Sequence, residues 1–173
     1  VIDTGVNYTH PDLGGCFGQN CKVAGGYDYV NNNSEPMDDH GHGTHVSGIA
    51  AANGGIKGMA PDANIIAIKS CNSVGECRTS DVLSGIDWCT SNATKFNISV
   101  ISMSLGAGLY STYCDDSEVL TTSINSAVGN NISVIVAAGN DGNSSQISSP
   151  ACVKNSTSIG SITKNFAFSS FTN

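Results

Sequence analysis

The chain has few basic residues and no long apolar run. Only 7 of its 173 residues are Lys or Arg, against 14 Asp or Glu, and the formal net charge is −7 at pH 7. Because nucleic acids are held by clustered Lys and Arg side chains, this balance argues against a nucleic-acid partner. No run approaches the roughly 18 consecutive apolar residues of a membrane span, so we expect no transmembrane segment.

The chain opens on Val1 rather than on an initiator Met, and it stops at Asn173 with no closing element. We interpret it as a piece of a longer protein, one partial domain over residues 1–173. A chain of this length can bury about 70% of the surface that its unfolded state exposes, so a real core is expected. No internal repeat, linker or low-complexity tract divides it.

Seven cysteines are a high count. Cys16 with Cys21, and Cys71 with Cys77, are close enough in sequence to close small loops, which indicates an oxidising compartment and a secreted, extracellular protein. None of the spacings is the paired two-residue gap of a structural zinc site. Seven sequons permit glycosylation and add modestly to the same interpretation: Asn7, Asn32, Asn92, Asn97, Asn131, Asn143 and Asn155.

Short apolar runs alternate with helical patterns along the chain. Residues 1–2, 64–69, 99–103 and 132–138 predict buried strands, and residues 45–53, 80–92 and 117–128 predict helices, the second with Ser80 as its N-cap. Near-continuous hydrophobicity is typical of parallel strands covered on both faces. The alternation therefore predicts an α/β fold, a doubly wound, mostly parallel sheet with helices on both faces.

Three polar residues stand in order at loop edges. Asp3 and Asn140 each follow an apolar run, at the predicted carboxyl end of a strand, and His42 stands just before a predicted helix. In doubly wound sheets, functional residues lie at the carboxyl ends of the strands. A carboxylate that orients an imidazole, an imidazole that deprotonates a hydroxyl, and an amide that faces the oxyanion are the parts of acyl transfer through serine. What does not appear is an obvious nucleophile.

Four ordered segments resemble those of subtilisin-like serine proteases, the subtilases of peptidase family S8. They are Asp-Thr-Gly at 3–5, His-Gly-Thr-His-Val-Ser-Gly at 42–48, Ser-Met-Ser-Leu-Gly at 102–106 and Ala-Ala-Gly-Asn at 137–140. The resemblance spans nearly the whole chain and implies that its fold is subtilisin-like and incomplete at the C-terminal side. It also implies that Asp3 and His42 are two members of an Asp-His-Ser triad, and that Asn140 is the oxyanion donor.

The resemblance further implies a substrate groove for polypeptides in extended conformation. Main-chain hydrogen bonds would add the substrate as a strand beside Ser104, Leu105 and Gly106. The pocket for the residue before the scissile bond would be lined by small side chains, namely Ala137, Gly139 and Ala151. We expect a preference for large uncharged or aromatic residues there, a monomeric protein, and a propeptide as a candidate partner.

By the same resemblance, Cys71 and Cys77 would stiffen the rim of the cleft. Cys114 and Cys152 are candidates to pair across the floor of the specificity region, which would leave Cys89 free. The chemistry needs no cofactor. Calcium often stabilises this family, but the loop at 53–59 is short here, and we assign no metal ligands; the carboxylates to watch are Asp12, Asp28, Asp38 and Asp39.

The chain departs from the family because the Gly-Thr-Ser segment that carries the nucleophile is missing. Ser102 and Ser104 belong to the substrate strand, and Ser169 and Ser170 belong to a late loop. We therefore predict that these 173 residues alone hydrolyse nothing. A catalytically dead, peptide-binding module with a subtilase-like fold is the alternative from another functional class.

Each motif also has a simpler interpretation. The triplet Asp3-Thr4-Gly5 matches aspartic proteases, but that class needs a second triplet or a homodimer in an all-β fold. His40, His42 and His45, at spacings of two and three residues, could form a metal cluster, although the glycines between them argue against it. Asn140-Asp141-Gly142 taken alone reads as a turn, and its place after a buried run favours the oxyanion role.

Overall fold

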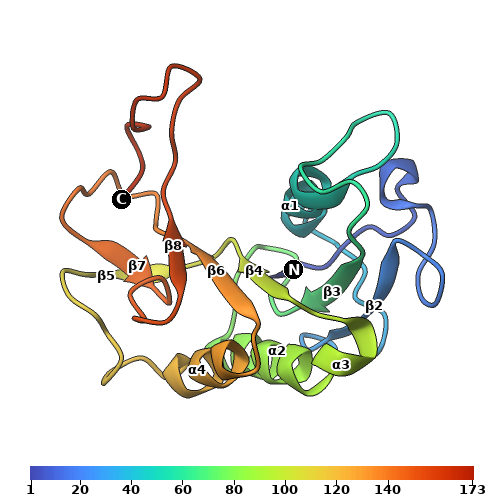
Figure 1. Cartoon of the computed structure of the whole chain (residues 1–173), viewed down its shortest axis with the longest axis horizontal. Helices are drawn as coiled ribbons and strands as arrows, with labels where there is room; N and C mark the ends of the chain where they lie inside the picture. The colour runs from blue at the N-terminus through green and yellow to red at the C-terminus, as the bar shows by residue number, and fades with distance from the viewer. The chain divides into compact units, whose positions relative to one another are not determined.

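Two three-stranded parallel sheets organise the chain (Figure 1). The computed structural model describes all residues from 1 to 173 and divides into two units, Val1–Asn97 and Ile98–Asn173. Each unit is described by itself below. The parallel strands and their helices confirm the predicted α/β class.

The sheet of the first unit has the strand order β1-β3-β2. Its strands are β1 (Ile2–Asp3), β2 (Val23–Asp28) and the central β3 (Ile65–Lys69). Asp3 and Asp28 both pair in register with Lys69, so the carboxyl ends of all three strands are level. Asp3 therefore lies at the carboxyl end of a parallel strand, as the sequence analysis predicts.

Helices cover both faces of the first sheet. They are α1 (His42–Ala51), α2 (Thr79–Ser91) and the short α3 (Ala93–Phe96), with a 3₁₀ turn η1 at Pro11–Leu13. Successive side chains of a strand point to opposite faces. In β1, Ile2 faces Gly85 of α2 and Asp3 faces Gly43 of α1, so the two helices lie on opposite sides of the same strand.

An apolar cluster anchors α1 and η1 to the sheet of the first unit. It is made of aliphatic side chains that are almost completely buried: Val6, Leu13, Val23, Ala51, Ala52, Ile65 and Ala67. Burying a side chain of the size of Val or Leu contributes about 1.5–3 kcal/mol relative to exposure. The loops at the carboxyl edge of this sheet therefore extend from a well-packed core.

The sheet of the second unit has the strand order β4-β6-β8, formed by β4 (Val100–Met103), β6 (Ser133–Ala137) and β8 (Thr157–Ile159). Helix α4 (Thr121–Gly129) packs against β6. An antiparallel ribbon of β5 (Ala107–Tyr110) and β7 (Ile147–Ser149) follows the end of β4. It lies where the chain leaves the sheet, beside the predicted substrate strand.

The structure corrects several predicted boundaries. Helix α1 begins at His42 rather than at residue 45, so His42 belongs to the helix itself. Helix α4 begins at Thr121 rather than at 117, because the amides of Ser117 and Glu118 close a turn onto the carbonyl of Cys114. Ser80 is not the N-cap of α2, since it lies inside the first turn, and Arg78 precedes the helix.

The sequence patterns missed four strands. β2 reads Val-Ala-Gly-Gly-Tyr-Asp, and its two glycines interrupt the apolar run that marks the other central strands. β5, β7 and β8 are short and rich in Gly, Ser and Thr, so neither alternation nor hydrophobicity indicates them. Their pairing comes from strands that are far away in the sequence.

Three disulfides are present, Cys16–Cys21, Cys71–Cys77 and Cys114–Cys152, the three pairs that the sequence analysis expects. Cys89 is a free, buried thiol on α2, and its burial raises its pKa to about 11. The longest helix has 13 residues, and no helix combines the length and the hydrophobicity that crossing a bilayer requires.

Candidate active site

Asp3 ends strand β1 with its carboxylate buried at the edge of the first sheet. Its side chain is 2% exposed, and its Oδ1 accepts a hydrogen bond from the backbone N–H of Thr4 at 2.7 Å. The same oxygen lies 2.7 Å from Nδ1 of His42. Its other oxygen, Oδ2, is buried and has no hydrogen-bond partner. The imidazole is therefore the principal polar side chain facing this buried carboxylate.

His42 is the first residue of α1, and its side chain is 45% exposed. One ring nitrogen faces Asp3, so the imidazole is held with its Nδ1 toward the carboxylate and its Nε2 away from it. A carboxylate that accepts from Nδ1–H selects the tautomer in which Nε2 is a free base. The pair can therefore take a proton from a hydroxyl that approaches from the solvent side.

Glycine makes the close approach of α1 to β1 feasible. A Cβ on Gly43 would lie 2.1 Å from the carbonyl oxygen of Gly5 and 3.1 Å from Cβ of Asp3. Gly5 itself has φ of 104°, and a Cβ there would lie 2.7 Å from the carbonyl oxygen of Pro36. The glycines of the two motifs thus let the helix reach the strand end closely enough for the imidazole to meet the carboxylate.

Thr4 and Asp38 fix the start of α1. The Thr4 hydroxyl donates to Asp38 Oδ1 at 2.8 Å and accepts from the backbone N–H of Gly43 at 2.9 Å. Asp38 Oδ2 accepts from the N–H and the hydroxyl of Thr44, so it serves as a cap for a helix whose own N-cap residue, Gly41, has no side chain.

The Asp38 carboxylate also accepts hydrogen bonds from the backbone N–H groups of His40 and Gly41. Partial burial alone would raise its pKa, but the hydrogen bonds from Thr44, Gly41 and His40 outweigh that effect and lower the pKa below its ordinary value. Asp38 therefore stays ionised and organises the turn that carries His42.

Lys69 was not anticipated as part of the site. Its side chain is 1% exposed, and its Nζ donates to the carbonyl oxygens of Thr4 and Cys71 and to Asp39 Oδ1 at 2.6 Å. It ties the strand end to the loop that leads into α1. The one sequence feature that indicates a special role for Lys69 is its charge, which directly follows the apolar run Ile-Ile-Ala-Ile.

The second unit contains a groove of about 650 Å³ at the end of β4 and β6. It is lined by Ser104, Leu105 and Gly106, and by Ala137, Gly139 and Asn140. The structure thus brings six of the residues that the sequence assigned to substrate or oxyanion binding around one hollow. Ala151 is buried and is not among the lining residues.

Five lining residues of this groove were not predicted: Ala107, Gly108 and Leu109 of β5, Asp141, and Ser148 of β7. Ser148 of β7 is 4% exposed, and a Cβ on Gly139 would lie 2.6 Å from its Oγ, so the Gly139 backbone lies close against the Ser148 side chain. Asp141 follows Asn140 at the groove and adds a carboxylate to its lining. No pattern in the sequence indicates Ser148, because its place depends on the pairing of β7 with β5.

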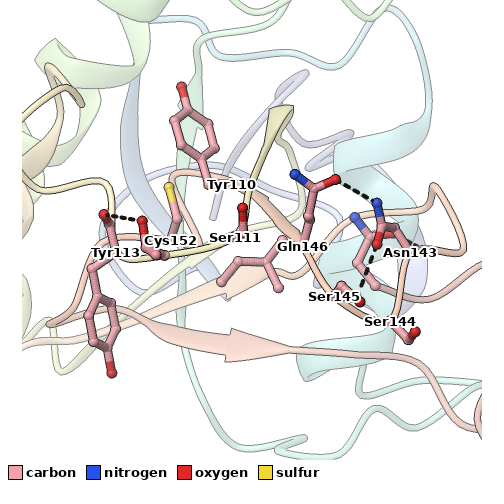
Figure 2. A pocket seen from close by; sticks show the side chains of 11 residues that line it. Tyr110, Ser111, Tyr113, Asn143, Ser144, Ser145, Gln146 and Cys152 are labelled. Atoms are coloured by element: carbon pink, nitrogen blue, oxygen red, sulfur yellow. Dashed lines mark hydrogen bonds between the residues drawn. The ribbon is translucent and has the colours of Figure 1, made fainter.

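A second hollow of about 510 Å³ in this unit lies beside the ribbon (Figure 2). Tyr110 and Tyr113 lie on one side of it, and Asn143 and Gln146 lie on the other. Asn143 Nδ2 donates to Gln146 Oε1 at 2.8 Å, and Asn143 Oδ1 accepts from the backbone N–H of Ser145.

The four carboxylates considered for calcium all have partners within the chain. Asp12 accepts from the N–H groups of Gly55 and Ile56, Asp28 accepts from Asn31, and Asp39 pairs with Lys69, while Asp38 caps α1. They therefore do not form a common ligand set for a hard cation. No three His, Cys, Asp or Glu side chains lie together as metal ligands, so the histidine-cluster interpretation is not supported.

His40 and His45 take other positions around His42. The ring centroids of His40 and His42 are 6.4 Å apart, and His40 is exposed beside Gly75 of the Cys71–Cys77 loop. His45 is exposed one turn further along α1. Of the three histidines, only His42 contacts the buried carboxylate.

The sequence profile described as the subtilase family, Peptidase_S8, matches residues 1–173. The chain belongs to the subtilase family. It is 38% identical over 177 residues to the thermophilic serine proteinase of Bacillus sp. (strain AK1), covering 100% of this chain and 40% of that protein. It is 37% identical over 175 residues to thermitase of Thermoactinomyces vulgaris, covering 99% and 57%.

Solved structures agree with this assignment. The crystal structure of a cold adapted subtilisin-like serine proteinase superposes with a TM-score of 0.81 at 33% identity, covering 99% of this chain and 57% of that one. Sphericase superposes with a TM-score of 0.82 at 30% identity, with the same coverage. The predicted subtilisin-like fold is confirmed. The chain spans between 24% and 58% of the length of the curated relatives that it matches.

Proposed function

We propose that this chain is the part of a subtilisin-like serine endopeptidase that carries the acid and the base of its Asp-His-Ser triad. The observation that supports this most directly is the 2.7 Å contact between Oδ1 of Asp3 and Nδ1 of His42, made at the level edge of a parallel sheet in a member of the subtilase family. The substrates, the nucleophile and the whole activity belong to the full-length protein.

In the proposed reaction, Asp3 holds the His42 ring and stabilises the imidazolium as it forms. Nε2 of His42 takes the proton of the attacking serine hydroxyl and then gives it to the leaving amine. The side-chain amide of Asn140 would donate to the oxyanion. In subtilisin, a relative of this chain, removing one such donor costs about 10²–10³ in rate.

The serine nucleophile is proposed to come from the part of the full-length protein that relatives carry beyond the match. A purified chain of residues 1–173 should therefore show no peptide hydrolysis. Robust cleavage by this material that a serine-directed inhibitor abolishes would refute the proposal. A full-length sequence without a Gly-Thr-Ser segment would instead favour the catalytically dead, peptide-binding alternative.

Substitutions in the full-length protein test the roles of the pair. His42→Ala and Asp3→Asn should each lower kcat by about 10⁴-fold or more, because the base or its orientation is lost. His45→Ala is the matched control, since it removes an exposed imidazole from the same helix and should leave kcat within a few-fold. Full activity of His42→Ala would exclude this pair as the catalytic machinery.

The groove of the second unit is the proposed binding site for the substrate. An extended peptide would pair its main chain with Ser104, Leu105 and Gly106 as an added strand. Its small lining residues support a preference for large uncharged or aromatic residues before the scissile bond. Profiling the full-length enzyme on a peptide library tests this, and dominance of acidic or basic residues there would contradict it.

We also propose that the protein is secreted, because three disulfides need an oxidising compartment to form and persist. Glycosylation, a monomeric state, a propeptide partner and a structural calcium in the full-length protein stay predictions. Finding the protein in the medium with its disulfides intact tests secretion. Loss of thermal stability on chelation, restored by added calcium, tests the calcium prediction.

A further inference from the structure

The seven sequons differ in what the asparagine side chain does in the folded chain. Three of them use Nδ2 as a hydrogen-bond donor inside the fold: Asn92 to Trp88 O at 2.9 Å, Asn143 to Gln146 Oε1 at 2.8 Å, and Asn155 to Asn125 Oδ1 at 2.9 Å. Figure 2 shows the Asn143 amide turned toward Gln146. A sugar on these nitrogens would have to compete with that contact.

Asn32 lies in a turn that is ordered without help from its own Nδ2. The backbone of Asp28 and Asn33 forms a reciprocal pair of hydrogen bonds across the turn. The N–H and Nδ2 of Asn31 donate to the two carboxylate oxygens of Asp28 at 2.9 and 2.8 Å. Asn32 itself is exposed and has φ of 54°, in the left-handed region that asparagine tolerates.

The carbonyl oxygen of the Asn32 side chain is held in place. The hydroxyl of Tyr27 donates to Asn32 Oδ1 at 2.8 Å. An N-linked sugar replaces one hydrogen on Nδ2 and leaves Oδ1 unchanged as an acceptor, so this hydrogen bond survives the modification. The linkage would therefore begin from an oriented amide rather than from a freely rotating one.

The tyrosine that bonds this amide packs against a second aromatic ring. The rings of Tyr27, on β2, and Tyr29, just after the end of β2, have centroids 4.8 Å apart, and both side chains are half-buried. An aromatic ring offers an apolar face with negative electrostatic potential, which suits the C–H face of a pyranose. The other exposed sequons in the left-handed region, Asn97 and Asn131, have no aromatic hydroxyl bonded to their amide.

We propose that Asn32 is an N-glycosylation site of this protein and that its first sugar lies against Tyr27. In the transfer, Asn32 Nδ2 forms a bond to the anomeric carbon of a lipid-diphosphate-linked oligosaccharide. The bond from that carbon to the diphosphate oxygen breaks, the lipid diphosphate leaves with the electron pair, and the amide proton passes to a base of the transferase. The glycan is bulky and hydrophilic, which suits the exposed turn.

Site occupancy is tested on the full-length protein secreted from a eukaryotic host. Release of N-glycans by a peptide amidase in ¹⁸O water converts each glycosylated Asn into labelled Asp. We expect label at Asn32, loss of that label in Ser34→Ala, and its retention in Ser34→Thr, which keeps the sequon. A secreted protein whose Asn32 peptide is unlabelled overturns the proposal.

A double-mutant cycle tests the contact with the ring. Removing the glycan by Ser34→Ala, compared with Ser34→Thr, should lower Tm by about 2 °C or more when Tyr27 is present. In a Tyr27→Leu background, which keeps an apolar side chain, the same pair should differ much less, whereas Tyr27→Phe should retain most of the difference. An equal difference in all three backgrounds overturns the proposed contact.

Discussion

Replacing Gly43 by alanine should damage catalysis through the geometry of the Asp3–His42 pair alone. The added Cβ would lie 2.1 Å from the carbonyl oxygen of Gly5, whereas real Cβ atoms essentially never come closer than 3.0 Å to such an atom. The helix start must therefore move away from the strand end by about 1 Å. The atoms that the new Cβ would meet are the backbone carbonyl oxygen of Gly5 and Cβ of Asp3. Neither is the end of a flexible side chain, so neither can move aside to relieve the clash.

That displacement acts on the residue next to His42. A misplacement of about 1 Å at a catalytic group can lower the rate about 10²-fold. The overpacking itself should destabilise the fold by about 1–3 kcal/mol. Because the 2.7 Å contact with Asp3 is also stretched, we expect kcat to fall more than the affinity for substrate.

Gly48→Ala in the same helix is the matched control. A Cβ at Gly48 meets nothing within 4 Å, so the substitution should be tolerated and should stabilise α1 by about 0.5–1 kcal/mol through the helix propensity of alanine. Peptide hydrolysis and thermal unfolding of both full-length variants are the measurements. Wild-type kcat and Tm in Gly43→Ala would refute the argument that this glycine is required by close backbone approach.

Asp38→Asn should lower the free energy of unfolding by about 1 kcal/mol near neutral pH, because the cap of α1 is weakened. The folded-state pKa of Asp38 is lowered, so the carboxylate contributes to stability above the ordinary Asp pKa. This contribution is lost as the pH falls through the lowered folded-state pKa. In a plot of unfolding free energy against pH, the variant should therefore have a flatter acid limb, that is, a smaller loss of stability toward low pH. Removing the Cys114–Cys152 disulfide, which spans 38 residues, should cost about 4 kcal/mol, and removing Cys71–Cys77, which spans 6, should cost about 2 kcal/mol.

Denaturant titrations at several pH values check all three variants. An acid limb of Asp38→Asn that parallels the wild type would show that the carboxylate contributes nothing by being ionised. Equal losses for the two disulfides would contradict the loop-entropy argument, which ranks them by the length of chain that each one closes.

Local patterns predicted the central strands well and the polar turns poorly. The run that becomes β3 is apolar throughout, and burial on both faces selects such a sequence whatever surrounds it. The start of α1 was placed three residues late, because Gly41 and Gly43 weaken a helical pattern when only propensity is considered. In the structure, Asp38 supplies the cap from outside the helix, which no periodicity reveals.

The sequence by itself determined the order of the chemical groups and the α/β class, because short motifs and hydrophobic runs are local properties, and its cysteine spacing supports the proposal of an oxidising compartment. Its motifs also predicted that His42, rather than His40 or His45, is the base. Only the tertiary structure decided how the imidazole meets Asp3 across 39 residues, and that Thr4, Asp38 and Lys69 hold the turn in place. Those contacts depend on the register of β1 against β3 and on the approach of α1 to β1, which the chain establishes only when distant segments pack together.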